Sequence, residues 1–181
     1  MPERGDRRAD IVRAAFDHLA RSGFEGLRLR QIAEDIGIDH STLHHHFPTK
    51  QHIVAEVARY AIGRSAVTPP EHAGTAETLR AYLSHLVRLS AEAPEVFAVT
   101  AELDLRARRD PAVRAILDEH ETNWRRSLHE LLTAGAAENA WAARVNAAEA
   151  TELIIAVVKG VQLAPNTAEM AFAQLEALLM R

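Results

Sequence analysis

The interpretation of this chain depends most on the stretch Leu29-Arg-Gln-Ile-Ala-Glu-Asp-Ile-Gly-Ile-Asp-His-Ser-Thr-Leu-His-His-His-Phe-Pro-Thr-Lys50. Its spacing predicts one short helix over 29–36 and a second over 40–46. Gly37 between them can adopt the left-handed backbone conformation that ends a helix and redirects the chain. Asp39 precedes the second helix, where we expect its carboxylate to accept hydrogen bonds from free backbone N–H groups. The layout is that of a helix-turn-helix, which lays its second helix in the major groove of DNA.

The two faces of this predicted unit differ in chemistry. Ala33 is small where the two helices must approach closely, and the residues expected inside are Ile32, Ile36, Ile38, Leu43 and Phe47. The outward residues of the second helix can all hydrogen-bond base edges or phosphates, and they are His40, Ser41, Thr42, His44, His45 and His46. Lys50 begins the next helix, where a positive side chain and a helix N-terminus together favour phosphate.

Outside this stretch almost every segment has helical periodicity, and no run alternates as a half-buried strand does. Helices are predicted over 7–22, 50–64, 75–92 and 95–108. Three more are expected to begin where side chains can cap them, at Asp110 before Pro111, at Asn146 and at Asn166 or Thr167. Two prolines and a glycine within 68–75 mark a loop. The prediction is an all-α chain of about nine helices, a small N-terminal helical unit followed by a larger bundle.

Composition limits the possible classes of protein. The 181 residues include 48% hydrophobic residues, enough for a core, and no cysteine, which excludes disulfides, thiolate metal sites and a cysteine nucleophile. The net charge is −4, and residues 1–66 carry ten Lys and Arg against nine Asp and Glu. Charge alone is therefore weak evidence for nucleic acid, and the motif carries that prediction. With no signal-peptide pattern and no membrane-spanning run, we expect a soluble, cytoplasmic protein without a membrane partner.

Residues 7–58 resemble the DNA-binding region of the TetR family of transcriptional repressors. The matching positions are Ile11, Ala14, Ala15, Phe16, Gly23, Phe24, Ile32, Ala33, Gly37, Ile38, Thr42, Leu43, Phe47 and Lys50. The resemblance implies DNA contacts from Arg30, Gln31 and Lys50 and from the six outward residues named above. The chain departs from the family pattern at His44, where tyrosine is usual, at Arg28, where threonine is usual, and at Asp39, where serine is usual.

The resemblance also implies an organisation and a function. We expect a helix-turn-helix DNA-binding domain over 1–49 and a helical ligand-binding and dimerisation domain over 50–181. The expected protein is a homodimeric transcriptional regulator, a repressor that binds a near-palindromic operator and responds to an unknown small-molecule effector. It is expected to need no cofactor. The alternative is a helical protein-interaction module without sequence-specific DNA binding.

Two further groups of residues in the larger bundle are candidates for binding. Tyr82, His85, Phe97, His120 and Trp124 could line a ligand cavity together, or each could be an ordinary core residue. The helix after Asn146 is apolar nearly all round, which fits either a central core helix or a helix shared between core and dimer interface. The candidate interface residues are Leu153, Val157, Val161, Leu175 and Leu178.

Metal binding and catalysis find less support in the sequence. His40 and His44 are four residues apart on one helix and could chelate zinc or nickel, but as solvent-facing DNA contacts they need no metal, and we predict none. A di-iron bundle needs Glu-x-x-His pairs, and the residues three before His85, His120 and His129 are Tyr82, Leu117 and Arg126. No phosphate-binding glycine loop is present, so we expect no enzyme.

Overall fold

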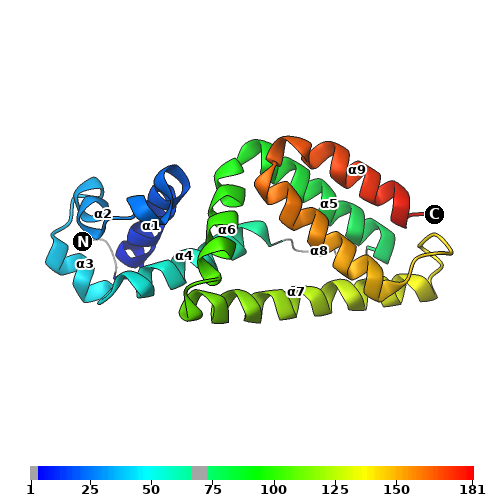
Figure 1. Cartoon of the computed structure of the whole chain (residues 1–181), viewed down its shortest axis with the longest axis horizontal. Helices are drawn as coiled ribbons and strands as arrows, with labels where there is room; N and C mark the ends of the chain where they lie inside the picture. Colours follow the sequence, from blue (N-terminus) through cyan, green and yellow to red (C-terminus); the bar gives the residue numbers. More distant parts are fainter. Residues whose placement is uncertain (1–3, 67–72) are drawn as a thin grey trace. The chain divides into compact units, whose positions relative to one another are not determined.

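The computed structural model describes residues 4–66 and 73–181, and within these ranges it contains nine α-helices, one 3-10 turn and no strand (Figure 1). The all-α prediction is confirmed. The helices are α1 (Arg4–Gly26), α2 (Leu29–Asp35), α3 (His40–His46), α4 (Lys50–Ser65), α5 (Thr75–Glu92), α6 (Pro94–Ala107), α7 (Pro111–Ala137), α8 (Ala147–Leu163) and α9 (Ala168–Leu179), with a 3-10 turn at Pro165–Thr167. None of the helices in the described ranges is long and apolar enough to cross a bilayer.

The helices form two compact units. The N-terminal unit comprises residues up to Arg64 together with 98–118, and the C-terminal unit comprises 65–97 and 119–181. The last part of α6 and the first part of α7 therefore belong with α1 to α4. The predicted domain limits of 1–49 and 50–181 stay a prediction.

The core of the N-terminal unit is built by helices whose apolar stripes match their predicted spacing. Gly23 interrupts α1 with a φ of 60°, so the regular helix ends where the sequence predicts. The largest fully buried side chains come from α1 to α4, from the residue after α3 and from α6, and they are Ile11, Phe16, Leu19, Ile32, Leu43, Phe47, Ile53 and Leu103. Phe16 also meets Tyr60 edge to face, with ring centroids 5.2 Å apart, which ties α1 to α4.

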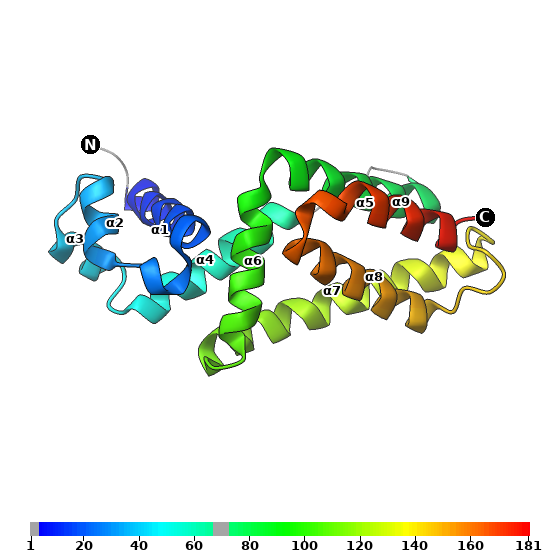
Figure 2. The ribbon, with the colours of Figure 1, turned by 45° about the horizontal axis from the view of Figure 1, so that its top comes forward.

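The C-terminal unit is built around α5, α8 and α9, and α9 lies along both α5 and α8 (Figures 1 and 2). The predicted stripe of α5 is buried, and it consists of Leu79, Leu83, Leu86 and Leu89. Asn146 caps α8 as predicted, because its Oδ1 accepts hydrogen bonds from the N–H groups of Ala148 and Glu149 at 2.9 and 3.2 Å. Asp110 caps α7 in the same way.

The start of α9 differs from the prediction of a side-chain cap. Thr167 occupies the N-cap position, but its hydroxyl donates a hydrogen bond to the carbonyl oxygen of Ala164 at 2.8 Å. The 3-10 turn at Pro165–Thr167 runs directly into α9, so Thr167 already has a helical backbone and its side chain points back along the chain.

Candidate nucleic-acid interface

The turn between α2 and α3 closes through the backbone. Gly37 has a φ of 66°, as the prediction requires, and nothing lies within 4 Å of where its Cβ would be. The Gly37 N–H donates to the Glu34 carbonyl at 3.1 Å, and the Ile38 N–H donates to the Ala33 carbonyl at 2.9 Å. These two bonds satisfy carbonyls that the end of α2 would otherwise leave free. Ala33 is buried, as expected.

α3 presents a polar face above two buried anchors. Leu43 and Phe47 are fully buried, whereas His40, Ser41, His44 and His45 are exposed and Thr42 and His46 are half-buried. All six residues predicted to face outward are therefore accessible to a partner. The imidazole rings of His40 and His44 lie 4.5 Å apart between centroids, in an edge-to-face arrangement.

Two expectations about this helix pair need correction. Asp39 is the N-cap residue of α3, but its carboxylate accepts no hydrogen bond from the helix backbone. Its side chain stays exposed and points away from the free N–H groups. Ile36 and Ile38 are half-buried and not part of the fully buried core, because they lie on the turn, where fewer side chains surround them.

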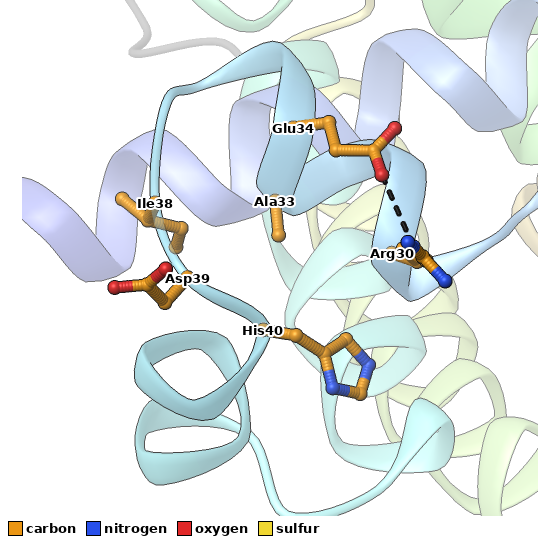
Figure 3. A pocket seen from close by; sticks show the side chains of 6 residues that line it. All are labelled: Arg30, Ala33, Glu34, Ile38, Asp39 and His40. Atoms are coloured by element: carbon orange, nitrogen blue, oxygen red, sulfur yellow. Dashed lines mark hydrogen bonds and ion pairs between the residues drawn. The ribbon is translucent and has the colours of Figure 1, made fainter.

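The predicted helix-2 contacts are exposed beside a hollow. Arg30 and Gln31 are both exposed, and the Nε of Arg30 donates to Glu34 Oε1 at 3.1 Å. An open hollow of about 430 Å³ lies between α2 and α3, lined by Arg30, Ala33, Glu34, Ile38, Asp39 and His40. Figure 3 shows the Arg30–Glu34 pair on one side of the hollow and Asp39 on the other, with Ala33 between them. One carboxylate therefore pairs with the one guanidinium that is expected to reach a base, and a second carboxylate lies across the hollow from it.

Lys50 stands where the sequence places it, at the first residue of α4, but its amino group already has a partner. Its Nζ donates to the carbonyl oxygen of Phe24 at 3.0 Å. Partial burial lowers the pKa of Lys50 below its ordinary value, and the Arg106 guanidinium nearby lowers it further. Arg106 itself lies over the Phe24 ring, 5.3 Å from its centroid. An ammonium has three donors, so this bond leaves two that can meet a phosphate.

The histidines of α3 do not form part of a larger ligand cluster. Among the residues that the structure describes, no group of three or more His, Asp or Glu side chains gathers in a way that could hold a metal ion. His40 and His44 thus remain a pair of adjacent imidazoles on an exposed helix face.

Some of the aromatic candidates in the C-terminal unit lie close together. His120 and Trp124 stack on one face of α7, with ring centroids 6.2 Å apart. Burial raises the pKa of the Tyr82 hydroxyl, and the neighbouring Trp124 indole opposes this shift. Burial also lowers the pKa of His85, with the Arg88 guanidinium lowering it further. Phe97 is fully buried and belongs to the core.

Among the described residues of this unit, three buried polar atoms make no well-formed hydrogen bond, although the Tyr82 hydroxyl lies beside the Trp124 indole: His85 Nε2, Trp124 Nε1 and Gln162 Oε1. Two ion pairs join α7 to α8, Glu121 with Lys159 at 2.7 Å and Arg125 with Glu152 at 2.6 Å. Because residues later in α7 pair with residues earlier in α8, the two helices run antiparallel. The sequence pattern does not predict a role for Gln162, which follows Lys159-Gly160-Val161 near the end of α8.

Comparison with known proteins decides the family. Residues 11–57 match the model of the bacterial regulatory proteins of the tetR family, and residues 75–181 match that of the C-terminal part of BetI-type transcriptional repressors. The chain belongs to the TetR family. The helix-turn-helix of α2 and α3 lies within the first match, and every candidate for effector binding or dimerisation lies within the second.

Individual relatives of this TetR-family chain are regulators. The transcriptional repressor AcnR of Corynebacterium diphtheriae is 30% identical over 115 residues, and AcnR of Corynebacterium glutamicum is 29% identical over 118. Each alignment covers 64% of this chain and only 57 to 58% of the relative, so the chain spans less than two thirds of these repressors.

Solved structures share the fold over nearly the whole chain. Salmonella enterica GusR superposes with a TM-score of 0.80 at 23% identity, covering 98% of this chain and 95% of GusR. A putative regulator from Saccharomonospora viridis, solved in complex with choline, superposes with a TM-score of 0.76 at 19% identity, covering 98% and 100%. At these identities the likeness concerns the fold alone.

Proposed function

We propose that this TetR-family chain is a transcriptional repressor that binds a near-palindromic DNA operator as a homodimer and releases it when an effector binds. The observation that carries the proposal is α3. This helix has six accessible polar side chains and packs on the core through Leu43 and the following Phe47. A helix of this kind fits the major groove, where base edges can be distinguished by hydrogen bonds. A DNA partner places this function in the cytoplasm, and we propose no catalytic role.

The proposed contacts divide into base reading and phosphate binding. Arg30, Thr42 and the histidines of α3 are the candidates for base edges, since imidazole, hydroxyl and guanidinium groups all match base donors or acceptors. Lys50 is the candidate for a phosphate through the donors that Phe24 does not use. Gln31 and Ser41, exposed beside them, can bond either.

Dimerisation through α8 and α9 is supported by apolar side chains left at the surface. Leu153 and Leu178 are 42% and 39% exposed, and Leu163 and Met170 are more than 70% exposed. Val161 and Leu175, also candidates from the sequence, are only 2% exposed, so they pack inside the chain's own core. The proposed interface therefore consists of Leu153, Val157 and Leu178 with Leu163 and Met170, and two helices from each subunit would form a four-helix bundle.

The proposed effector site is the group of buried polar atoms on α5, α7 and α8. An indole N–H is a donor only, so Trp124, which makes no well-formed hydrogen bond although the Tyr82 hydroxyl lies beside it, calls for an acceptor, and Gln162 Oε1 calls for a donor. Unpaired buried polar groups are costly, and a ligand that pairs them gains affinity. We propose an effector with an apolar body that carries both a donor and an acceptor. Choline, present in the Saccharomonospora viridis regulator, has a hydroxyl of that kind and a cation suited to aromatic faces.

The DNA-binding proposal is tested by gel shift with fragments of the genome that encodes the chain. We expect one or a few fragments to be retained at physiological salt, with Thr42→Ala plus Lys50→Ala weakening retention while the circular dichroism spectrum is unchanged. The control is Thr133→Ala plus Arg126→Ala, which removes a threonine and a basic residue from exposed positions of α7. Retention of no specific fragment by the wild type would instead favour the protein-interaction module.

The effector proposal is tested separately by calorimetry. Choline, as a first probe, should bind the wild type and release the retained fragment, and Trp124→Phe should weaken choline binding by removing the indole donor. If choline has no effect but another molecule with a donor and an acceptor releases the fragment, the proposed site stands and choline is not its ligand. Equal binding of such a molecule by the wild type, Trp124→Phe and Gln162→Leu would contradict the site.

A further inference from the structure

Arg8, near the start of α1, makes three contacts, two with the C-terminal end of α3 and one with α4. Its Nη1 donates to the backbone carbonyl oxygen of His46 at 3.1 Å. Its Nη2 pairs with Glu56 Oε1 on α4 at 3.1 Å. The guanidinium carbon lies 4.3 Å from the centroid of the Phe47 ring. One side chain therefore joins α1, the end of α3 and α4 within the N-terminal unit.

α3 has few other means of holding its position. It is seven residues long, and isolated helices of that length are unstable in water. Its N-cap residue Asp39 contributes no side-chain bond. Its C-terminal carbonyls carry the negative end of the helix dipole, which a guanidinium stabilises. Apart from the buried Leu43 and Phe47, Arg8 is thus a principal anchor of α3, and it acts at the end that bears His44, His45 and His46.

We infer that Arg8 is a positioning residue for DNA reading: it fixes the orientation of α3 and does not itself bind DNA. The inference rests on the proposed function, since it concerns how the proposed DNA-reading helix is held. Its guanidinium uses the two nitrogens of its fork on His46 and Glu56 and one planar face on Phe47. Planar, forked geometry is what distinguishes arginine from lysine, whose ammonium is a point charge.

This geometry separates positioning from a direct phosphate contact. A phosphate contact depends mainly on charge, so Arg8→Lys would largely restore it, whereas a lysine cannot bond His46 and Glu56 and stack on Phe47 at once. Loss of a phosphate contact also weakens binding to all DNA sequences and reduces the salt slope of log K by about 0.9. Loss of positioning weakens binding to the operator and leaves binding to unrelated DNA unchanged.

The experiment compares Arg8→Ala, Arg8→Lys and Arg59→Ala in the full chain. Arg59 is the matched control, because its Nη1 pairs with the same Glu56 oxygen at 3.0 Å from within α4. Affinities for a retained fragment and for an unrelated duplex are measured across a salt series. We expect both Arg8 variants to lose about tenfold in operator affinity, the effect of one charge-assisted hydrogen bond, with unchanged affinity for the unrelated duplex. Arg59→Ala should match the wild type.

A second readout does not depend on DNA. Backbone amides of α3 should exchange with deuterium faster in both Arg8 variants than in the wild type, while amides of α5 exchange at the wild-type rate. Recovery of operator affinity by Arg8→Lys, an equal loss on unrelated DNA, or unchanged exchange in α3 would each overturn the inference. If the wild type binds no specific DNA but α3 exchanges faster in both variants, the proposed function fails while the anchoring of α3 by Arg8 stands.

Discussion

Gly135, in α7, is explained by the packing of Trp141. The Trp141 side chain is 5% exposed, and its Nε1 donates to the carbonyl oxygen of Leu132 at 2.7 Å. A Cβ at position 135 would overlap the Cε2 and Cζ2 atoms of the indole and lie 2.6 Å from its Nε1. Gly135→Ala therefore cannot be accommodated unless the indole moves away from α7.

The size of the effect follows from three contributions. Alanine in place of glycine favours the helix by up to about 1 kcal/mol. Displacing the indole breaks its hydrogen bond, at about 1 to 2 kcal/mol for a buried donor. Exposing half of an indole, about 100 Å², costs a further ~2.5 kcal/mol. The net prediction is destabilisation by about 3 kcal/mol, or a fall in melting temperature of about 6 to 12 °C for a chain of this size.

The assay is urea unfolding followed by circular dichroism and by tryptophan fluorescence. The chain has two tryptophans, so a Trp124→Phe background leaves Trp141 as the reporter. Gly135→Ala should lower the unfolding midpoint and shift Trp141 emission to the red in the folded state. The matched control is Gly63→Ala in α4, where nothing lies within 4 Å of the added Cβ, and this variant should be neutral or slightly stabilised. A Gly135→Ala variant as stable as its parent, with unshifted emission, would refute the packing argument.

Three further predictions concern assembly, stability and DNA binding. Leu153→Glu plus Leu178→Glu should yield a monomer by light scattering, whereas Leu105→Glu, at an exposed site on α6, should not; a dimer in both cases would exclude the α8–α9 interface. Because burial lowers the pKa of His85, the unfolded chain binds more protons below the ordinary value of 6.5, so stability falls as the pH drops below it. Urea midpoints at pH 7 and pH 5 should therefore differ less in His85→Gln than in the wild type. Operator affinity should fall in His44→Ala, because the exposed imidazole that is proposed to reach base edges is removed; an unchanged affinity would contradict this.

Most of the fold could be predicted because its determinants are local. The apolar stripe of α5, the proline after Asp110 and the cap at Asn146 each specify a helix from residues within a few positions of one another. The turn at Gly37 is equally local, since its backbone conformation favours glycine at that position.

The contacts that position the candidate sites could not be predicted in the same way. Arg8 donates to the His46 carbonyl, 38 residues away in the sequence. Gln162 becomes a candidate only in the structure, where its side-chain oxygen is buried without a hydrogen-bond partner. Periodicity places a residue on a helix face but does not reveal which distant backbone group that face meets. The contact between Trp141 and Gly135 shows the same limit, because no sequence pattern indicates which side chain packs against a glycine inside a helix.

Lys50 shows how such a distant contact changes a functional argument. Its place at the start of α4 follows from local pattern, but the partner of its amino group is the Phe24 carbonyl, 26 residues earlier. Lys50→Ala therefore removes an intramolecular bond between α4 and the end of α1 as well as any phosphate contact. Thr42 has no such second role in holding the helices. Comparing the two single variants thus separates the roles: Thr42→Ala should weaken operator binding alone, and Lys50→Ala should also lower the urea midpoint of the N-terminal unit.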